Sequence, residues 1–303
     1  MTLFPNPLVA APRLLSAARP LTKTGRALHF PLIRIPLLLL ALAPVGALNF
    51  GLSVLVLDRL PEPIASNQLG IQALFLLPLL IWAYSTFCRK VDGREAWEFS
   101  SRGAFWEFLA GASISASWIG GLVGVLALAG CYRVVETQGT LTLFNSFFLF
   151  GLGSFAQELL FSLVLFRLLE DWLGSWRALL VSALVFAAAH AFNPGTSALS
   201  ILDLFVGGAS YLAAFIYSRR MWLVWGLHFS WNFFQAGVFG MPNSGIAFKG
   251  LVKPAISGPA WLTGGAFGIE ASVLTLTFSV CLAALLLTLS SRHAQILAAR
   301  WRR

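Results

Sequence analysis

The sequence predicts an all-α integral membrane protein, a bundle of about eight transmembrane helices. Hydrophobic residues make up 58% of the 303 residues and charged residues only 11%, whereas a soluble domain carries about a quarter charged residues. The apolar residues form repeated long runs, each near the ~20 residues with which a helix crosses a bilayer. Because open strands cannot satisfy their backbone in lipid, we predict that these runs are helical.

The runs predict eight spans in chain order. They lie at 36–57, 69–88, 108–131, 141–166, 176–193, 199–218, 221–240 and 267–289. The first span includes Val45-Gly46-Ala47, which is similar to a signal-peptide cleavage site, but its long basic leader predicts a retained helix. In the third span, Gly120 and Gly124 form a small-x-x-x-small pair that predicts close helix packing. The Gly-, Pro- and Ser-rich segment 241–266 is predicted to be an external loop.

The basic residues predict the orientation of the bundle. If the amino terminus is cytoplasmic, only Arg59, Arg133, Lys249 and Lys253 fall outside, and the other 17 of the 21 Lys and Arg residues fall inside. The positive-inside rule therefore places both termini, and the loops near 95, 172 and 219, in the cytoplasm. The chain then divides into a basic cytoplasmic amino-terminal segment (1–35), three spans (36–140), a polar-motif core (141–290) and a basic cytoplasmic tail (291–303).

The net charge of +9 favours a membrane surface over nucleic acid, because the basic residues stand between apolar runs and form no patch. We expect membrane lipid as a partner and no nucleic acid. The cysteines Cys88, Cys131 and Cys281 lie in or at the ends of apolar runs without C-x-x-C spacing. They predict neither a zinc knuckle nor a disulfide.

Polar groups inside the predicted spans are candidates for function, because burying an ionisable group there costs at least ~2.5 kcal/mol. Spans four and five form a hairpin that turns near Leu173-Gly174. Glu158 precedes this turn and His190 follows it at a similar separation, so both should lie near mid-membrane. His228 lies in the cytoplasmic half of span seven, and Asn232 lies one turn deeper.

Helical spacing gives these residues their expected directions. His228 and Asn232 are four residues apart and share a face, as do Glu158 and Ser162. Gln157 is rotated by about 100° from Glu158, so both can border one cavity. We predict that Glu158, His190, His228 and Asn232 line a single polar cavity.

Each residue also has a structural interpretation. Glu158, taken alone, is explained equally well as a structural acid. His190 could cap the external end of span five, and Phe186 could be a packing residue. His228 and Asn232 could join helices by hydrogen bonds worth ~0.6–2 kcal/mol. Asp203, in span six, is better explained as a structural partner. Four polar groups at compatible depths nevertheless favour a site.

Two of these pairs form motifs that resemble a known family. The chain reads Phe186-Ala-Ala-Ala-His190 and then His228-Phe-Ser-Trp-Asn232. These are similar to the F-x-x-x-H and H-x-x-x-N motifs of the CPBP family (CAAX prenyl protease and bacteriocin-processing, also called Abi) of intramembrane proteases. The resemblance covers about 140 to 300 well and makes 141–290 the CPBP-like catalytic core.

The first motif of that family, E-E-x-x-x-R, departs from the pattern here. Gln157 stands in place of the first Glu, Glu158 matches the second, and Ser162 stands in place of the Arg. The resemblance implies that His190 is the partner of the base and that His228 and Asn232 hold the oxyanion. The carboxylate role falls to Glu158, and the two departures predict a weakened or altered protease.

The resemblance implies an endopeptidase that hydrolyses a peptide bond of a membrane-associated peptide or lipid-anchored protein with Glu/His-activated water. We expect the protein to lie in a bacterial-type inner membrane. The sequence establishes no cofactor for the hydrolysis. Zinc, if bound, would be ligated by Glu158, His190 and His228, although no H-E-x-x-H pattern is present. The alternatives are a catalytically weakened scaffold or binding protein and a proton-coupled transporter. We see no inverted repeat that would favour the transporter.

Overall fold

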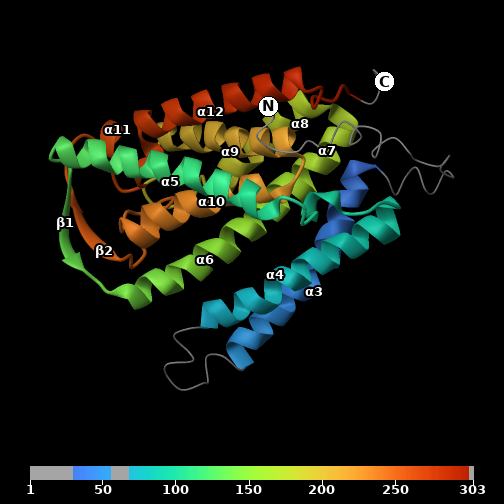
Figure 1. Cartoon of the computed structure of the whole chain (residues 1–303), viewed down its shortest axis with the longest axis horizontal. Helices are drawn as coiled ribbons and strands as arrows, with labels where there is room; N and C mark the ends of the chain where they lie inside the picture. Colours follow the sequence, from blue (N-terminus) through green and yellow to red (C-terminus); the bar gives the residue numbers. More distant parts are fainter. Residues whose placement is uncertain (1–29, 56–67, 300–303) are drawn as a thin grey trace.

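The computed structural model describes residues 30–55 and 68–299, which form a helical bundle with one small sheet (Figure 1). The α-helices are α3 (Pro31–Leu55), α4 (Gln68–Phe87), α5 (Ala104–Leu128), α6 (Thr140–Glu158), α7 (Arg167–Leu173), α8 (Ser175–Ala189), α9 (Ala198–Ser218), α10 (Met221–Asn232), α11 (Ala260–Thr263) and α12 (Val273–Arg292). Short π-helical segments, called π turns below, occupy Cys88–Asp92, Leu159–Phe166 and Phe233–Val238. Short 3₁₀ helices occupy Trp97–Phe99 and Ile269–Ala271. The strands are β1 (Tyr132–Thr137) and β2 (Val252–Ile256).

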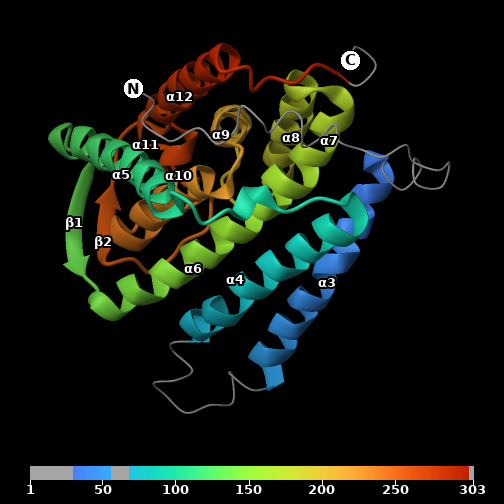
Figure 2. The ribbon, with the colours of Figure 1, turned by 45° about the vertical axis from the view of Figure 1, so that its right-hand side comes forward.

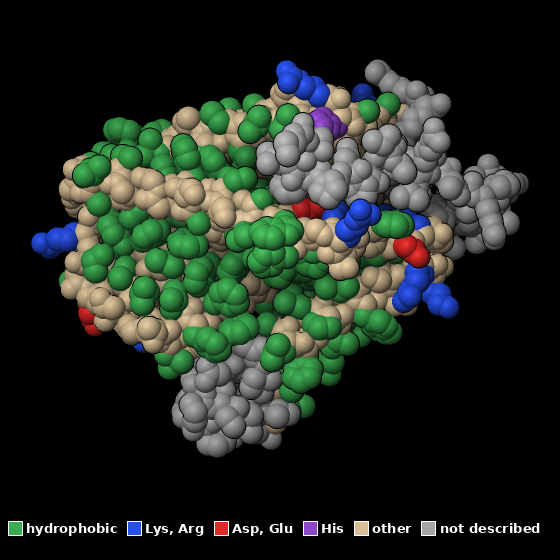
Figure 3. All heavy atoms as spheres, viewed as in Figure 1, with side chains coloured by type: hydrophobic (Ala, Val, Ile, Leu, Met, Phe, Trp, Pro, Cys, Tyr) green, Lys and Arg blue, Asp and Glu red, His purple; other side chains and the backbone are tan. Residues whose placement is uncertain are grey.

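The prediction of an all-α, multi-pass membrane protein is confirmed. In the described part of the chain, six helices are long and apolar enough to cross a membrane, and one of them runs unbroken from Thr140 to Leu173. The remaining two predicted spans are shorter: α8 has 15 residues, and α10 has 12 before it continues as a π turn. Apolar side chains cover most of the visible face, as expected of a lipid-facing surface (Figure 3).

Several predicted boundaries move. The first helix begins at Pro31, so Arg34 belongs to the membrane helix and not to the amino-terminal segment. The eighth begins only at Val273, because the Ser272 hydroxyl accepts a hydrogen bond from the Thr275 amide and caps it. The rest of the predicted amino-terminal segment, Arg59, and residues 300–303 of the tail lie outside the described residues.

A two-stranded antiparallel sheet corrects the prediction that 241–266 is entirely loop. β2 lies in that segment and pairs with β1, in a register that places Val134 opposite Pro254. The sheet lies at one end of the bundle, joining the segment after α5 to the segment before α11 (Figure 1). The Pro254 ring cannot donate to a ladder, which a two-stranded edge tolerates.

Close packing of α5 against α10 depends on two glycines. A Cβ at Gly111 would lie 2.3 Å from the Leu223 carbonyl oxygen, and a Cβ at Gly226 would lie 2.2 Å from the Phe108 carbonyl oxygen. The prediction that Gly120 and Gly124 pack closely was wrong, since a Cβ at either would meet no described atom within 4 Å. The backbones of α5 and α10 approach this closely only because Gly111 and Gly226 lack side chains.

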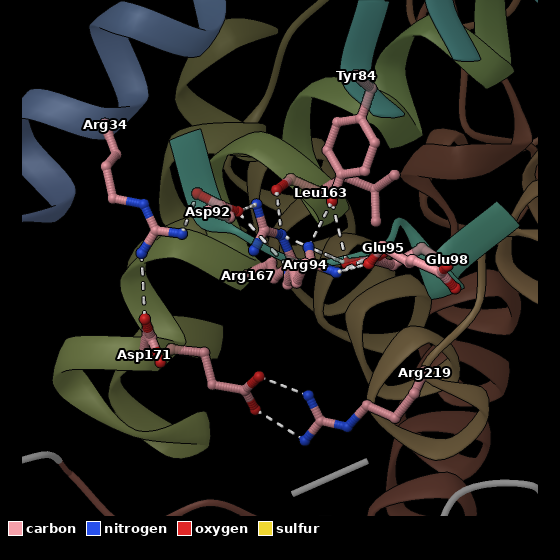
Figure 4. Close-up of polar contacts among 11 residues, drawn as sticks. Arg34, Tyr84, Asp92, Arg94, Glu95, Glu98, Leu163, Arg167, Asp171 and Arg219 are labelled. Atoms are coloured by element: carbon pink, nitrogen blue, oxygen red, sulfur yellow. Dashed lines mark hydrogen bonds and ion pairs between the residues drawn. The ribbon is translucent and has the colours of Figure 1, made fainter. Parts of the chain in front are cut away.

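An ion-pair cluster ties α3 and the segment after α4 to the helix hairpin of α7 and α8 (Figure 4). Asp92 accepts from Arg34 at 2.6 Å and from Arg167 at 3.1 Å, and Arg94 pairs with Glu98 at 2.6 Å. Burial alone would raise the pKa of Glu98, but the nearby guanidinium groups of Arg94 and Arg167 bring that pKa below its usual value. The paired charges offset the cost of burying five ionised side chains.

A separate ion pair lies at the same end of the bundle. It joins Glu170 of α7 to Arg219, directly after α9, with 2.5 Å between Oε2 and Nη1. The segments near 95, 172 and 219, predicted to share one side of the membrane, therefore lie together. Both ribbon views place them at the end of the bundle opposite the sheet, with α3 and α4 side by side along one edge (Figures 1 and 2). Which side of the membrane this end faces stays a prediction.

Candidate active site

Glu158 ends α6 and is buried, with 2% of its side chain exposed. Its Oε1 lies 2.7 Å from Nδ1 of His228, and its Oε2 accepts a hydrogen bond of 2.6 Å from the Ser162 hydroxyl. Ser162 lies four residues further along the chain, as the shared face predicted. Both carboxyl oxygens are therefore occupied, which offsets the cost of placing an acid inside a membrane helix.

His228 lies on α10 and is the partner of Glu158, whereas the resemblance had implied His190 for that position. The Tyr211 ring stacks on the imidazole at 4.6 Å between centroids with 16° between planes. Because Nδ1 is engaged with Glu158, Nε2 is the ring nitrogen left for a ligand. The stacked ring and the Glu158 contact together fix the orientation of the imidazole.

His190 directly follows the last residue of α8, and its Nδ1 lies 2.8 Å from the Phe186 carbonyl oxygen. A carbonyl only accepts, so Nδ1 carries the proton in the neutral ring and Nε2 carries the free lone pair. The Phe186 ring lies 4.8 Å from the His190 ring and 6.3 Å from the His228 ring. Phe186 thus packs between the two imidazoles, and its own position requires Gly208, where a Cβ would come within 3.0 Å of the Phe186 ring.

Asn232 ends α10, one helical turn from His228. Its Oδ1 accepts a hydrogen bond of 3.0 Å from Nδ2 of Asn243. Asn243 also donates to Oε1 of Glu270 at 3.3 Å, and Glu270 accepts from the Ser244 amide at 2.5 Å. With its oxygen held in this way, the amide nitrogen of Asn232 remains as a donor.

One cavity of about 390 Å³ connects these groups. Gln157, Phe186, His190, His228 and Asn232 are among the residues that line it. Glu158 and Ser162 are not in its lining; Glu158 reaches the cavity only through His228. The structure therefore gathers three of the four predicted residues at the cavity wall and places the acid behind one of them.

Two of the helices that carry the site, α6 and α10, widen at the site itself. α6 passes into the π turn at Leu159–Phe166 directly after Glu158, and α10 passes into the π turn at Phe233–Val238 directly after Asn232. π turns are rare and occur frequently at functional sites, where the extra residue shifts the side chains that follow. No pattern in the sequence indicated either turn.

Sequence reasoning missed the contribution of Asn243 and gave Glu270 no role. Asn243 lies in the segment that was predicted to be a loop, and Glu270 falls at the start of the predicted eighth span, 267–289. An Asn beside Pro and Ser is usually explained as a turn residue. Its contact with Asn232, 11 residues earlier, follows from how the chain returns to the bundle.

The three residues expected to ligate any zinc do not form a metal site. In the part of the chain that the structure describes, no three His, Cys, Asp or Glu side chains are placed to hold a metal ion. Glu158 contacts Nδ1 of His228, on the opposite side of that ring from the Nε2 atom that could ligate a metal, and Glu158 does not line the cavity. The donor set of Glu158, His190 and His228 therefore does not fit tetrahedral zinc, for which at least three ligands must converge.

The described helices form a multi-pass bundle in which His190, His228 and Asn232 line one cavity and Glu158 contacts His228 from behind. Residues 138–234 match the family described as Type II CAAX prenyl endopeptidase Rce1-like. This match supports assignment of the chain to the CPBP/CAAX protease family and includes all three sequence motifs. No curated protein and no solved structure matches the chain.

Proposed function

We propose that this chain is an intramembrane endopeptidase that hydrolyses a peptide bond of a membrane-associated peptide or protein. The observation that carries the proposal is the 2.7 Å contact between Glu158 and His228 in the wall of a cavity that His190 and Asn232 also line. Amide hydrolysis needs a base for water and preorganised donors for the oxyanion. The cavity offers candidates for both.

His190 is the proposed base. With its Nδ1 proton directed at the Phe186 carbonyl, Nε2 offers a lone pair to a water molecule in the cavity. The water oxygen attacks the substrate carbonyl carbon while its proton passes to Nε2. The same nitrogen then returns the proton to the leaving amine when the C–N bond breaks.

His228 and Asn232 are the proposed oxyanion donors. In its imidazolium form, His228 donates through Nδ1 to Glu158 and through Nε2 to the oxygen that becomes negative. The Asn232 amide, held through its oxygen by Asn243, supplies the second donor. The role of Glu158 is then to orient His228 and to supply its counter-charge, because both carboxyl oxygens are already bonded.

Gln157 lines the cavity where the resemblance implies a second acid. A carboxamide can position a water molecule but cannot take its proton, so we propose a slower protease rather than an efficient one. This observation also favours a second candidate, a scaffold or binding protein that has lost hydrolysis. The transporter alternative has no comparable observation in its favour.

A lipid-anchored substrate is supported by an apolar cavity of about 420 Å³ between α4, α5, α6 and α10. Its wall contains Phe and Trp side chains, among them Phe108, Phe148, Trp222 and Trp225. A hydrocarbon chain attached to a peptide could occupy such a cavity, each buried methylene contributing about 0.8 kcal/mol.

We propose a cell (inner) membrane location with both termini in the cytoplasm. The clustering of the segments near 95, 172 and 219 at one end of the bundle supports a shared side for these loops. Reporter fusions at each loop test the proposal, and a fusion near 172 that reports from outside would contradict it.

Proteolysis in reconstituted membranes tests the enzyme proposal. Wild type and a His190→Ala variant are mixed with membrane proteins, and newly formed peptide ends are mapped. We expect ends that depend on wild type and disappear with the variant. If the two proteins give the same set of ends, the scaffold interpretation replaces the protease.

A further inference from the structure

A pair of acids, Asp203 and Glu270, lines the same cavity and takes no direct part in the mechanism above. Asp203, on α9, lines the cavity and has 3% of its side chain exposed. Its Oδ2 is buried and, among the described residues, has no hydrogen-bond partner. A buried acceptor without a hydrogen-bond partner destabilises the folded protein unless a ligand or another group donates a hydrogen bond to it.

Glu270, from the 3₁₀ turn before α12, is the other member of the pair. It is buried, lines the same cavity and interacts electrostatically with Asp203 and with His228. Burial raises the pKa of Glu270 to about 7, although its bonds from Ser244 act in the opposite direction. A nearby positive charge would therefore stabilise the ionised form of Glu270.

None of the described residues that line the cavity is a lysine or an arginine that could supply such a charge. His228 also interacts electrostatically with Glu270, but its imidazole is already bonded to Glu158 at 2.7 Å. Two neighbouring carboxyl groups cannot both ionise at low cost unless a cation lies between them.

We propose that Asp203 and Glu270 form a subsite that binds a cationic group of the ligand, an ammonium, amidinium or guanidinium. That the ligand is the substrate rests on the proposed function; the binding itself does not. Asp203 offers the free Oδ2, and Glu270 offers the carboxyl group that Asn243 connects to Asn232. A basic substrate side chain bound there would place a neighbouring peptide bond beside the oxyanion donors. The subsite would select peptides with a basic residue close to the cleaved bond.

A binding measurement that needs no hydrolysis tests the subsite. Purified protein in a non-ionic detergent is titrated with benzamidine, which is cationic, and with benzamide, its neutral counterpart of nearly the same shape, by calorimetry. Wild type should bind benzamidine at least about tenfold more tightly than benzamide, as expected for a charge-assisted contact. Asp203→Asn, which preserves the shape of the side chain, should abolish this preference, and Glu270→Gln should weaken it.

The matched control is Glu136→Gln, which removes an exposed acid of β1 outside the cavity and should keep the wild-type preference. The unliganded melting temperature of each variant shows whether it is folded. Equal binding of the two probes by wild type, or an unchanged preference in folded Asp203→Asn, overturns the subsite. Cation binding without proteolysis would leave the subsite in place and refute the protease.

Discussion

The carboxyl group of Glu158 and the imidazole of His228, 70 residues apart in the chain, lie 2.7 Å from each other inside the bundle. This contact joins α6 to α10 and holds Nδ1 of the imidazole. It gives the single acid of the first motif a partner within the membrane.

Glu158→Gln should abolish most hydrolysis. The variant keeps the shape of the side chain but removes the negative charge that faces His228, so the imidazolium form loses its counter-charge. We expect a fall of about 10²–10³ in kcat, the range seen when an oxyanion donor is lost. The measurement is cleavage of a membrane-anchored peptide by protein in liposomes. Ser162→Ala is the control, since it removes one hydrogen bond to the same carboxylate and should cost less. Unchanged activity in Glu158→Gln would show that the carboxylate has been given the wrong role.

Gln157→Glu should raise the rate of hydrolysis. The new carboxylate would line the cavity together with His190 and could accept a proton from water. General-base catalysis contributes about 10²–10⁴-fold, and a gain within this range is the expected result in the same liposome assay. A variant no faster than wild type would mean that His190 alone supplies the base. If wild type is inert and only the variant cleaves, the native chain acts as a scaffold.

Asn243→Asp should reduce turnover without greatly changing substrate binding. The substitution keeps the size of the side chain but removes the Nδ2 donor that holds Oδ1 of Asn232 at 3.0 Å. A donor that is no longer held contributes less to the oxyanion, so we expect kcat to fall about tenfold or more while KM changes little. Asn193→Asp, which alters an amide bonded to the Ser244 carbonyl, is the matched control. An equal loss in both variants would point to a general disturbance of the loop.

Gly226→Ala should destabilise the protein. Its new methyl group would lie 2.2 Å from the Phe108 carbonyl oxygen, so α10 must move away from α5. Overpacking of this kind typically costs about 1–3 kcal/mol, which a lower thermal midpoint in detergent would reveal. Gly120→Ala makes the matched control, because its methyl group would meet no described atom within 4 Å. A stable Gly226→Ala variant would show that the helices separate without cost.

The sequence by itself determined that this protein lies in a membrane and that its membrane segments are helical. Long apolar runs have a low free energy only in lipid, and in lipid the backbone must bond within each helix. Short-range contacts also agree with the sequence: Ser162 was predicted to share a face with Glu158, four residues away, and it donates a hydrogen bond to that carboxylate. The turn between spans four and five was placed correctly for the same local reason, since Gly174 ends α7.

Tertiary structure decided which groups meet. Depth along a helix does not fix rotation about its axis, so the sequence could not tell whether Glu158 would face His190 or His228. The rotation depends on packing at Gly226 and on the π turns after Glu158 and Asn232, and neither leaves a signal in local composition. The contact of Asn243 with Asn232 arises from the same cause. Long-range packing in the folded bundle brought these side chains together, and no local preference of the chain specified it.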